Sequence, residues 1–343
     1  MVRSKSKDPH KVISIEDVAL RAGVSITTVS RVINKIPTVK KRNLAKVQEA
    51  IKELKFQPSV FAQRLATGHS NVVALVVPRY EGMFYSFYLL ELIRGIGTLC
   101  EVLKLDFLLH LTDSRASLNL RGVGGAIFAD VINNRHQLDI ALGEGVPCVV
   151  INNYVEDIAV DCIAVDNEGG AEQAVDYLIS LGHTRIAHIT GDLITQAAAA
   201  RLAGYKKALE RHKLPADESL IVRTDYSRGH ARQAAEKILT MASPATAIFV
   251  ASDSMALEVM AVARELGKSI PQDVSIVGFD DNPSGLYGPV ALTTVRQPLV
   301  TMAQEGLKKL NALMSSKKKE KAEKIFLPTE LIIRESCRSP RQA

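Results

Sequence analysis

The residues best suited to chemistry lie in a run near the N-terminus. If this run forms a helix, its solvent face carries mostly short polar side chains and one cation, namely Ile26, Thr27, Thr28, Ser30, Arg31 and Asn34. At the start of a helix in a major groove, Thr hydroxyl groups reach base edges or a thymine methyl, whereas Ile makes only apolar contacts. Hydroxyl groups, Arg31 and the helix N-terminus can hold phosphates. The run therefore predicts a DNA-reading surface, and from spacing alone a purely structural three-helix unit remains the alternative.

Three short helices are expected to position this run. Ser14 is predicted to cap the first helix, with Asp17 three residues later, and Gly23 permits the sharp turn that ends it. Ser25 is predicted to cap the second helix and Thr38 the third. Apolar residues recur at helical spacing and give the buried faces, namely Ile15, Val18, Ala19, Ala22, Val29, Val32, Ile33, Leu44, Val47, Ile51 and Leu54. This pattern is typical of a helix-turn-helix unit.

Positive charge is concentrated in this N-terminal part. Residues 1–68 hold 14 Lys and Arg against five Asp and Glu, whereas the whole chain has a net charge of +6, so the remaining residues have about −3. Lys and Arg that neutralise phosphates release condensed counterions, so a small basic unit on a near-neutral body suits a polyanion partner. A solvated basic tail is the alternative interpretation of the charge alone.

A short segment, from Pro58 to Thr67, joins the basic unit to the first apolar strand. Pro58 suits the start of a helix, and the following residues to Ala66 can form two turns before Gly68. Eight residues alone make a marginal helix in water, so the segment would form its helix when it meets a partner. A passive linker is the other possibility.

The remainder alternates apolar strand runs with helical stretches. The strand candidates are NVVALVV, LDFLLHL, GAIFA, PCVVIN, RIAHIT, TAIFVA and DVSIVGF. Continuous apolar strands are buried on both faces, which indicates a parallel α/β sheet. The pattern restarts near Gly169, so two similar halves are expected. Ligands of such sheets bind outside the carboxyl ends of the strands, and two facing halves would form a cleft there.

Composition excludes several classes of protein. With 343 residues, 47% hydrophobic and 23% charged, the chain is expected to fold as two or three units. No apolar stretch approaches the roughly 20 residues that cross a bilayer, and the N-terminus lacks an export signal. The four cysteines form no CxxC pair, so neither a zinc site nor a disulfide framework is predicted, and a reducing cytoplasm fits.

Catalytic machinery is not expected. The chain has no GxGxxG motif opening a helix, no GxxxxGK[ST] and no GxSxG. His183 and His188 do not share a face for metal binding, so both are interpreted as structural. Asp280 and Asp281 are adjacent on an extended segment and point apart, so they are not an acid/base pair. No catalytic residue, metal or cofactor is therefore predicted.

Motifs along nearly the whole chain resemble the LacI/GalR family of bacterial transcriptional regulators. They are residues 15–34, 47–54 and 58–68 near the N-terminus, then Val165-Asp166-Asn167, 181–189, 201–205, Ala251-Ser252-Asp253, 277–281 and Leu292-Thr293-Thr294-Val295. The resemblance implies an all-α helix-turn-helix head on an α/β periplasmic-binding-protein-like core of type I, built from two doubly wound parallel-sheet subdomains.

The resemblance also assigns DNA-binding roles. It implies that Ile26 and Thr27 discriminate operators and that Thr28, Ser30, Arg31 and Asn34 hold the DNA. In the joining segment it implies that Leu65 inserts into the central minor groove, with Ser59 and Ala62 on the same hinge helix, and Ser59 departs from the Asn of many members. Two hinge helices must lie side by side for such a wedge, so a homodimer on a near-palindromic site in double-stranded DNA is expected.

For the core, the resemblance implies an effector site in the cleft. The implied contacts are Asn152, Arg201, Tyr226, Ser252, Asp253, Asp280 and Gln297, with Asp253 also suited to capping its helix. A guanidinium, carboxylate, amide, hydroxyl and aromatic face suit a carbohydrate effector. A purine or nucleoside effector or corepressor is the alternative. Residues 112–124 are shorter than the crossover helix of most members, and residues 79–88 are longer and more aromatic than usual.

The expected organisation is a head over residues 1–58, a hinge helix and linker over 59–69, and a core over 70–338. Within the core, 70–166 and 296–322 are assigned to the first subdomain, and 167–295 and 323–338 to the second. The expected protein is a cytoplasmic repressor without a membrane partner. A cytosolic solute-binding protein and an enzyme with a regulatory head are the rivals from other classes.

Overall fold

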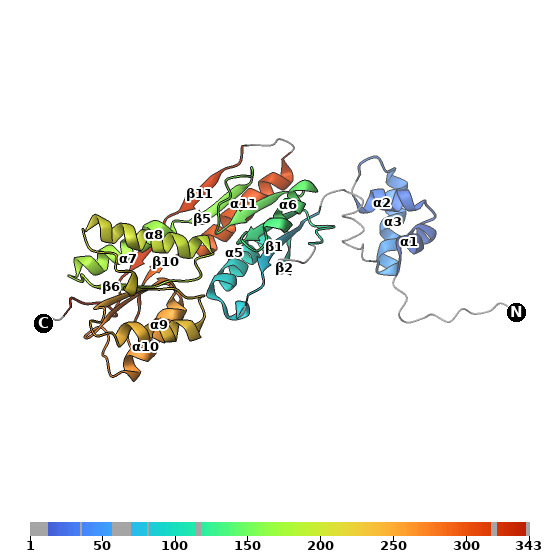
Figure 1. The fold of residues 1–343 in the computed structure, drawn as a ribbon. Helices are drawn as coiled ribbons and strands as arrows, with labels where there is room; N and C mark the ends of the chain where they lie inside the picture. Colours follow the sequence, from blue (N-terminus) through green and yellow to red (C-terminus); the bar gives the residue numbers. More distant parts are fainter. Residues whose placement is uncertain are drawn as a thin grey trace. The chain divides into compact units, whose positions relative to one another are not determined.

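The computed structural model describes residues 13–34, 36–56, 70–80, 82–113, 118–316 and 321–340. Contacts divide the chain into two units, Met1–Asn71 and Val72–Ala343, which we call the head and the core (Figure 1). The predicted hinge over residues 59–69, with Ser59, Ala62 and Leu65, lies outside the described residues. No helix in the described residues has the length and apolar character needed to cross a bilayer.

The head contains three helices around a small apolar core. They are α1 (Ile15–Ala22), α2 (Ile26–Ile33) and α3 (Lys41–Leu54). Val18, Val29 and Val47 are fully buried at the centre. The Ser14 hydroxyl accepts a hydrogen bond from the Asp17 amide at 3.3 Å, and the Asp17 carboxylate accepts one from the Ser14 amide at 2.9 Å. This reciprocal cap is the one that the sequence predicts.

Two of the helix ends predicted for the head are present in the structure, and a third is not. Gly23 has φ 63°, in the left-handed region that glycine adopts without strain, and Ser25 caps α2 through the Thr28 amide. The predicted Thr38 cap is wrong, because α3 begins at Lys41 after Lys40, which provides no side-chain cap. Val39 packs against the head core.

The first subdomain of the core is built on a six-stranded parallel sheet. Its strands are β1 (Val72–Pro78), β2 (Asp106–Thr112), β3 (Gly125–Ala129), β4 (Cys148–Ile151), β5 (Asp161–Val165) and β11 (Lys324–Leu327), in the order β11-β5-β4-β3-β1-β2. Helices α5 (Phe87–Leu103) and α11 (Leu299–Ser315) pack on one face, and α6 (Arg135–Gly143) packs on the other. A short 3-10 helix, η1 (Met83–Tyr85), follows β1.

The second subdomain has a similar sheet with one antiparallel edge strand. Its strands are β6 (Ile186–Ile189), β7 (Ile221–Val222), β8 (Ala247–Val250), β9 (Ser275–Asp280), β10 (Thr293–Arg296) and β12 (Glu330–Ile332), in the order β12-β10-β9-β8-β6-β7. Its helices are α7 (Asn167–Ser180), α8 (Gln196–Arg211), α9 (Arg228–Leu239), α10 (Asp253–Glu265), η2 (Glu218–Leu220) and η3 (Pro283–Leu286). Figure 1 shows α7 and α8 on one face and α9 and α10 on the other.

The two parallel α/β halves expected from the sequence are present, with one boundary corrected. The sequence assigns residues 323–338 to the second subdomain, but Lys324–Leu327 forms β11, which pairs with β5 of the first sheet. The chain therefore crosses between subdomains after β5, after β10 and after β11. β11 escapes the assignment because three of its four residues are exposed, so it lacks the continuous buried run that identifies strands such as β1 and β3.

The crossover between β2 and β3 contains no helix in its described residues. Leu118 and Leu120 are buried here and cover Ala74, Val76 and Phe128 on that face of the sheet. β2 is therefore an edge strand with part of one face open, and Leu108 is 40% exposed. The expectation that every strand is buried on both faces is wrong for β2.

Candidate functional site

The predicted DNA-reading residues lie together on the outer face of α2. Ile26, Thr27 and Arg31 are exposed, while Thr28, Ser30 and Asn34 are partly exposed. The opposite face of the helix is fixed by the buried Val29 and Val32. Packing and the Ser25 cap thus set the rotation of α2, which presents all six side chains to solvent.

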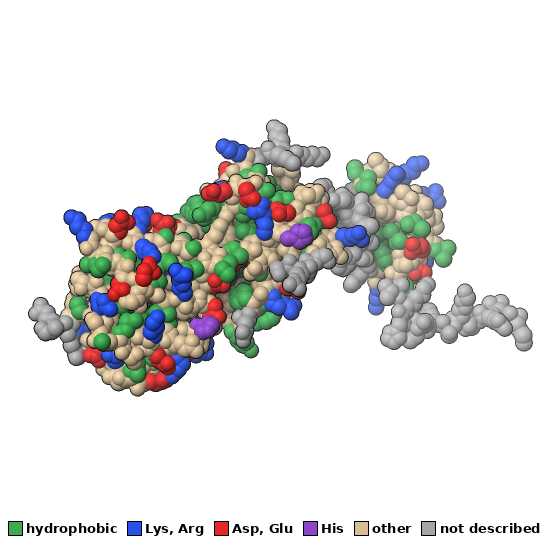
Figure 2. Space-filling view, in the orientation of Figure 1, with side chains coloured by type: hydrophobic (Ala, Val, Ile, Leu, Met, Phe, Trp, Pro, Cys, Tyr) green, Lys and Arg blue, Asp and Glu red, His purple; other side chains and the backbone are tan. Residues whose placement is uncertain are grey.

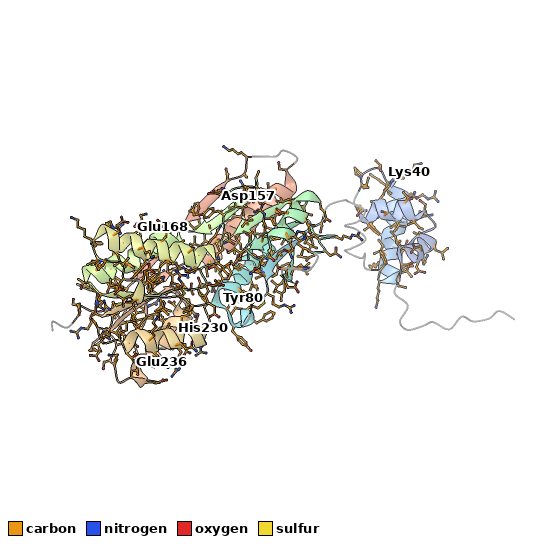
Figure 3. The ribbon with its side chains drawn as sticks, viewed as in Figure 1. Lys40, Tyr80, Asp157, Glu168, His230 and Glu236 are labelled. Atoms are coloured by element: carbon orange, nitrogen blue, oxygen red, sulfur yellow. The ribbon has the colours of Figure 1, made fainter. Side chains whose placement is uncertain are left out.

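A second polar feature of the head lies at the start of α3 and was not among the predicted site residues. Lys40, Lys41 and Arg42 are consecutive exposed cations, and the first turn contains no acidic residue. Figure 2 shows Lys and Arg side chains on the same edge of the head where Figure 3 labels Lys40. Cations near a helix N-terminus interact unfavourably with the positive end of the helix dipole. A bound anion there would interact favourably with both the cations and the helix N-terminus. The arrangement suits a phosphate group.

In the core, five of the seven predicted effector residues lie at or after the carboxyl ends of strands, in both subdomains, whereas Arg201 lies in α8 and Asp253 begins α10. Asn152 follows β4, Tyr226 follows the short β7, and Ser252 follows β8. Asp280 ends β9 and Gln297 follows β10. Because parallel strands end at the same edge of their sheet, each subdomain brings its polar residues to one side.

Arg201 and Asp280 form the electrostatic centre of the second subdomain's contribution. Arg201 is 4% exposed, and it donates from Nε to Asn167 Oδ1 at 2.8 Å and from Nη1 to the Ala251 carbonyl at 2.5 Å. Its guanidinium carbon lies 3.8 Å from the centre of the Phe279 ring. Burial raises the pKa of Asp280 to about 6, although Arg201 and a hydrogen bond from Gln297 act in the opposite direction.

Asp280 is held by Gln297 and by an unusual backbone conformation. Gln297 Nε2 donates to Asp280 Oδ1 at 2.5 Å. Asp280 has φ 127°, in a region that residues with a Cβ rarely adopt. A strained backbone conformation persists only where the surrounding contacts hold it in place, and such conformations are concentrated at binding sites.

Ser252 and Asp253 have structural partners. Ser252 caps α10, because its hydroxyl accepts a hydrogen bond from the Met255 amide. Asp253 is fully buried, and its two oxygens accept hydrogen bonds from Thr294 Oγ1 at 2.6 Å and the Asn282 amide at 2.7 Å. Burial and the Asp280 carboxylate raise its pKa well above the usual range. Asp253 therefore belongs to the scaffold behind Asp280, where it fixes the loop that follows β9.

Tyr226 packs against the loop after β6. A Cβ at Gly191 would lie 2.0 Å from the Tyr226 ring, so the ring lies directly on that glycine. Burial raises the pKa of the Tyr226 hydroxyl, and the carboxylates of Asp280 and Asp130 add to the increase. Asp130 follows β3 of the first sheet, so Tyr226 lies where groups of both subdomains meet.

The first subdomain contributes polar residues that sequence reasoning missed. Burial raises the pKa of Asp130, and the Asp192 carboxylate from the loop after β6 raises it further. Burial raises the pKa of Tyr80 and Tyr88, and the Asp130 carboxylate adds to both increases. In Figure 3, Tyr80 lies where the first subdomain meets the second. The position of Asp130 directly after the run GAIFA was the available signal, because it shares the strand-end placement of Asn152.

Several buried polar atoms of this region lack hydrogen-bond partners among the described residues. They are Tyr88 Oη, Asn152 Oδ1 and Gln297 Oε1, although the Asn152 side chain lies close enough to Tyr88 to lower the pKa of its hydroxyl. Buried polar atoms are almost always paired, and leaving one unpaired costs roughly 1–3 kcal/mol. A group of such atoms at the strand ends of two facing sheets indicates a site that a polar ligand or water completes.

Contacts between the subdomains are made by neighbours of Asn152. Asn153 Oδ1 accepts a hydrogen bond from the Val131 amide at 2.8 Å, and its Nδ2 donates to Gln196 Oε1 at 3.3 Å. A hollow of about 450 Å³ lies beside this contact, lined by Val131, Ile132, Arg135, Tyr154, Val155, Glu156, Asp157 and Gln196. None of the seven predicted effector residues lines this hollow, so the strand-end group and the hollow are separate features.

The residues interpreted as structural are buried or paired. Both ring nitrogens of His183 have hydrogen-bond partners within 3.1 Å. His188 stacks between Tyr205 and Phe249, and burial lowers its pKa to about 4. Its Nδ1 faces the Phe249 carbonyl, while its Nε2 is unpaired among the described residues, so the neutral ring is only half satisfied.

Asp281 points away from Asp280, as expected. It pairs with Arg296 at 2.7 Å and with Arg334. Across the described residues, no group of three His, Cys, Asp or Glu side chains is arranged to hold a metal ion.

Comparisons with known proteins match both the head and the core. Residues 14–59 match the family described as bacterial regulatory proteins, lacI family, and residues 175–337 match a periplasmic binding protein-like domain. The HTH-type transcriptional regulator DegA of Bacillus subtilis (strain 168) is 35% identical over 334 residues, which cover 94% of this chain and 97% of DegA.

Two solved structures share the fold over nearly the whole chain. The transcriptional regulator CelR in complex with cellobiose is 30% identical, with a TM-score of 0.72, and the match covers 94% of this chain and 99% of CelR. The lac repressor dimer bound to operator and the anti-inducer ONPF is 25% identical, with a TM-score of 0.80, and the match covers 96% of this chain and 100% of the repressor chain.

Proposed function

The chain belongs to the LacI family of bacterial regulatory proteins, and from that premise we propose that it is a homodimeric, operator-binding repressor whose DNA affinity changes when a carbohydrate occupies its cleft. Membership makes it a DNA-binding regulator of transcription, a class whose members are not enzymes. Because such a regulator works on the chromosome, we place it in the cytoplasm.

DNA recognition is assigned to the outer face of α2. Ile26 and Thr27 lie at its exposed start and read base edges, while Thr28, Ser30, Arg31 and Asn34 hold the backbone. The cations at the start of α3 add affinity that does not depend on sequence. The observation that carries the proposal is this single face, fixed by Val29 and Val32 and free of apolar partners from the rest of the head.

A homodimer is supported by exposed apolar residues at one edge of the first subdomain. Leu108 on the edge strand β2 is 40% exposed, and Val102 near the end of α5 is 71% exposed. Open sheet edges and exposed apolar groups are typical of association surfaces. The lac repressor structure with the same fold is a dimer on its operator. In the dimer, Leu65 is assigned to the minor-groove wedge, with Ser59 and Ala62 on the same hinge.

A carbohydrate effector is supported by the chemistry of the cleft. Arg201, Asp280 and Gln297 supply charged and amide groups, Tyr226 an aromatic face, and Asn152 an unpaired amide oxygen, whereas Ser252 and Asp253 mainly build the scaffold. CelR of this family has been solved with cellobiose and another member with ribose. A purine or nucleoside is the second candidate class, since it would use the same aromatic face.

Coupling between the cleft and DNA needs a ligand that prefers one arrangement of the subdomains. A tenfold change in operator affinity corresponds to about 1.4 kcal/mol of differential binding. The crossings after β5, β10 and β11 link the subdomains, so closure of the cleft would move the first subdomains of a dimer relative to each other.

The test begins with selection of preferred duplexes from a random pool by the full-length chain. Titrations at near-physiological salt then compare the selected duplex with a random one. Wild type is expected to prefer the selected duplex by at least 10³, and Leu65→Ala should weaken that binding far more than random binding. Equal affinity of wild type for both duplexes would overturn the proposed function, and equal losses in Leu65→Ala would overturn the wedge.

A further inference from the structure

Two amide oxygens at the strand ends, one of Gln297 and one of Asn152, are buried acceptors without a donor among the described residues. Gln297 is 8% exposed, and its Oε1 has no hydrogen-bond partner among the described residues, nor does Asn152 Oδ1. The orientation of the Gln297 amide is fixed, because its Nε2 donates to Asp280 and a flipped amide would place two oxygens together. The unpaired end is therefore an acceptor.

Three carboxylates lie in the same region, and the Arg201 guanidinium acts on one of them, Asp280. Asp130 and Asp192 each use Oδ1 to accept a backbone amide two residues later, at 3.1 Å and 3.0 Å, and Asp280 accepts from Gln297. Among the described residues, none of the three forms an ion pair. Half-buried or buried carboxylates are normally paired, so the free oxygens of this group call for donors.

The positive charge at this site is small. Arg201 is the cation that acts on Asp280 and Tyr226. Its Nε and Nη1 are already engaged by Asn167 and the Ala251 carbonyl. The Arg201 guanidinium is thus largely committed to protein partners, in a region that also holds three carboxylates and two amide oxygens, so the region is short of both donors and positive charge.

We propose that the cleft selects a ligand that donates several hydrogen bonds and carries no negative charge, namely a neutral or amino sugar, over uronates, sugar phosphates and purine bases. Hydroxyl or ammonium groups would satisfy the unpaired acceptors, whereas an anionic ligand would add a like charge to three carboxylates. A purine base would place the acceptor nitrogens of its own ring against the unpaired acceptor oxygens of the site. This inference rests on the proposed function, because it concerns the effector of the same cleft.

The charge of the site can be measured without knowing the effector. A thiol placed at Tyr80→Cys, close to Asp130, is treated with a trimethylammonium-bearing and a sulfonate-bearing methanethiosulfonate. Tyr287→Cys, at a side chain that is 85% exposed, is the matched control. Three native cysteines are buried and Cys337 is partly buried, so modification of each peptide is followed by mass spectrometry.

The measured quantity is the rate of modification by the cationic reagent divided by the rate of modification by the anionic reagent. This rate ratio is expected to be about tenfold higher at Tyr80→Cys than at Tyr287→Cys. Adding Asp130→Asn should lower this ratio severalfold and leave the ratio at Tyr287→Cys unchanged. A ratio at Tyr80→Cys equal to or below the control would overturn the inference.

Ligand preference is then measured on the full-length chain by thermal shift and calorimetry. The probes are glucose, glucosamine, glucuronate and glucose 6-phosphate, the corresponding galactose set, and hypoxanthine. Where a sugar binds, its neutral or amino form should bind at least tenfold more tightly than its anionic forms. Preference for an anionic form or for hypoxanthine overturns the inference.

The rate ratio decides the inference even if no sugar in the set binds. The proposed function fails separately, when the chain shows no preferred DNA sequence.

Discussion

Gln196 and Tyr154 exchange two hydrogen bonds between the subdomains of the core. The Tyr154 amide donates to Gln196 Oε1 at 3.0 Å, and Gln196 Nε2 donates to the Tyr154 carbonyl at 2.9 Å. Asn153 Nδ2 adds a third contact to the same oxygen. Gln196 is the first residue of α8 and follows the Thr195 cap, so its side chain projects from a rigid helix end. This side chain joins the second subdomain to the loop after β4.

Replacement of Gln196 by Ala is expected to loosen this junction. The variant removes three hydrogen bonds, each with a net contribution of about 1 kcal/mol, so the Tyr154 amide should exchange with solvent at least about tenfold faster. Hydrogen exchange measured by mass spectrometry on the peptide that contains Tyr154 tests this. Gln173→Ala is the matched control, because the Gln173 amide also bonds across the chain, to Thr329. Unchanged exchange at Tyr154 in Gln196→Ala would contradict the assignment.

Gly191→Ala is expected to damage the proposed effector site while leaving the fold intact. The new methyl group would lie 2.0 Å from the Tyr226 ring, so the ring must leave its position. Effector affinity should fall about tenfold or more, since loss of aromatic contact and reorganisation of the loop together exceed 1.4 kcal/mol. Calorimetry with a sugar that binds wild type measures the change. Gly229→Ala, where a Cβ meets nothing within 4 Å, should bind like wild type, and equal affinity in both variants would contradict the role of Tyr226.

The fold could be predicted for most strands that are continuous and apolar and less well elsewhere, and β5 was missed although all five of its residues are buried. β1, β3, β4, β6, β8 and β9 were all identified from such runs, because burial on both faces requires them. β10 was missed as a strand although Thr293 and Thr294 are fully buried, since threonine does not distinguish a buried strand from a loop. β7 has two residues and β11 has four, so their apolar residues form runs too short to identify a strand.

The site was predictable to the extent that it follows from strand ends. Asn152 and Asp280 fit that rule, and Asp130 fits it equally well but was passed over. The roles of Asp253 and Gln196 could not be predicted, because they depend on bonds to residues 41 and 42 positions away. Such bonds are created by the packing of one element on another, which a single sequence does not reveal.

Asp280 is expected to make stability depend on pH in a direction opposite to an ordinary carboxylate. Its pKa is about 6 in the folded protein against an ordinary value of 3.8. The folded state therefore holds its proton more tightly, so this stabilising contribution is full below about pH 4 and is lost as pH rises through 6. The free energy of unfolding of Asp280→Asn, relative to that of wild type, should increase by on the order of 2 kcal/mol from pH 4.5 to pH 7.5.

Denaturant unfolding at the two pH values measures this difference. Asp157→Asn is the control, because Arg135 lowers the pKa of Asp157 and this group stays ionised throughout the range. Its stability relative to wild type should be the same at both pH values. If Asp280→Asn behaves like this control, the carboxyl group of Asp280 titrates normally and the cleft is more open to solvent than the structure indicates.

Arg31 and Thr27 are expected to affect DNA binding in different ways. Both are exposed on α2, but a guanidinium contact to phosphate is independent of sequence, whereas a hydroxyl at the helix start reads a base edge. Arg31→Ala should weaken selected and random duplexes alike and reduce the slope of log affinity against log salt by about 1. Thr27→Ala should keep that slope and lose about 1–3 kcal/mol on the selected duplex only. Fluorescence anisotropy titrations at several salt concentrations separate the two effects. A sequence-selective loss in Arg31→Ala, or a uniform loss in Thr27→Ala, would mean that α2 lies in the groove with a rotation different from the one assigned here.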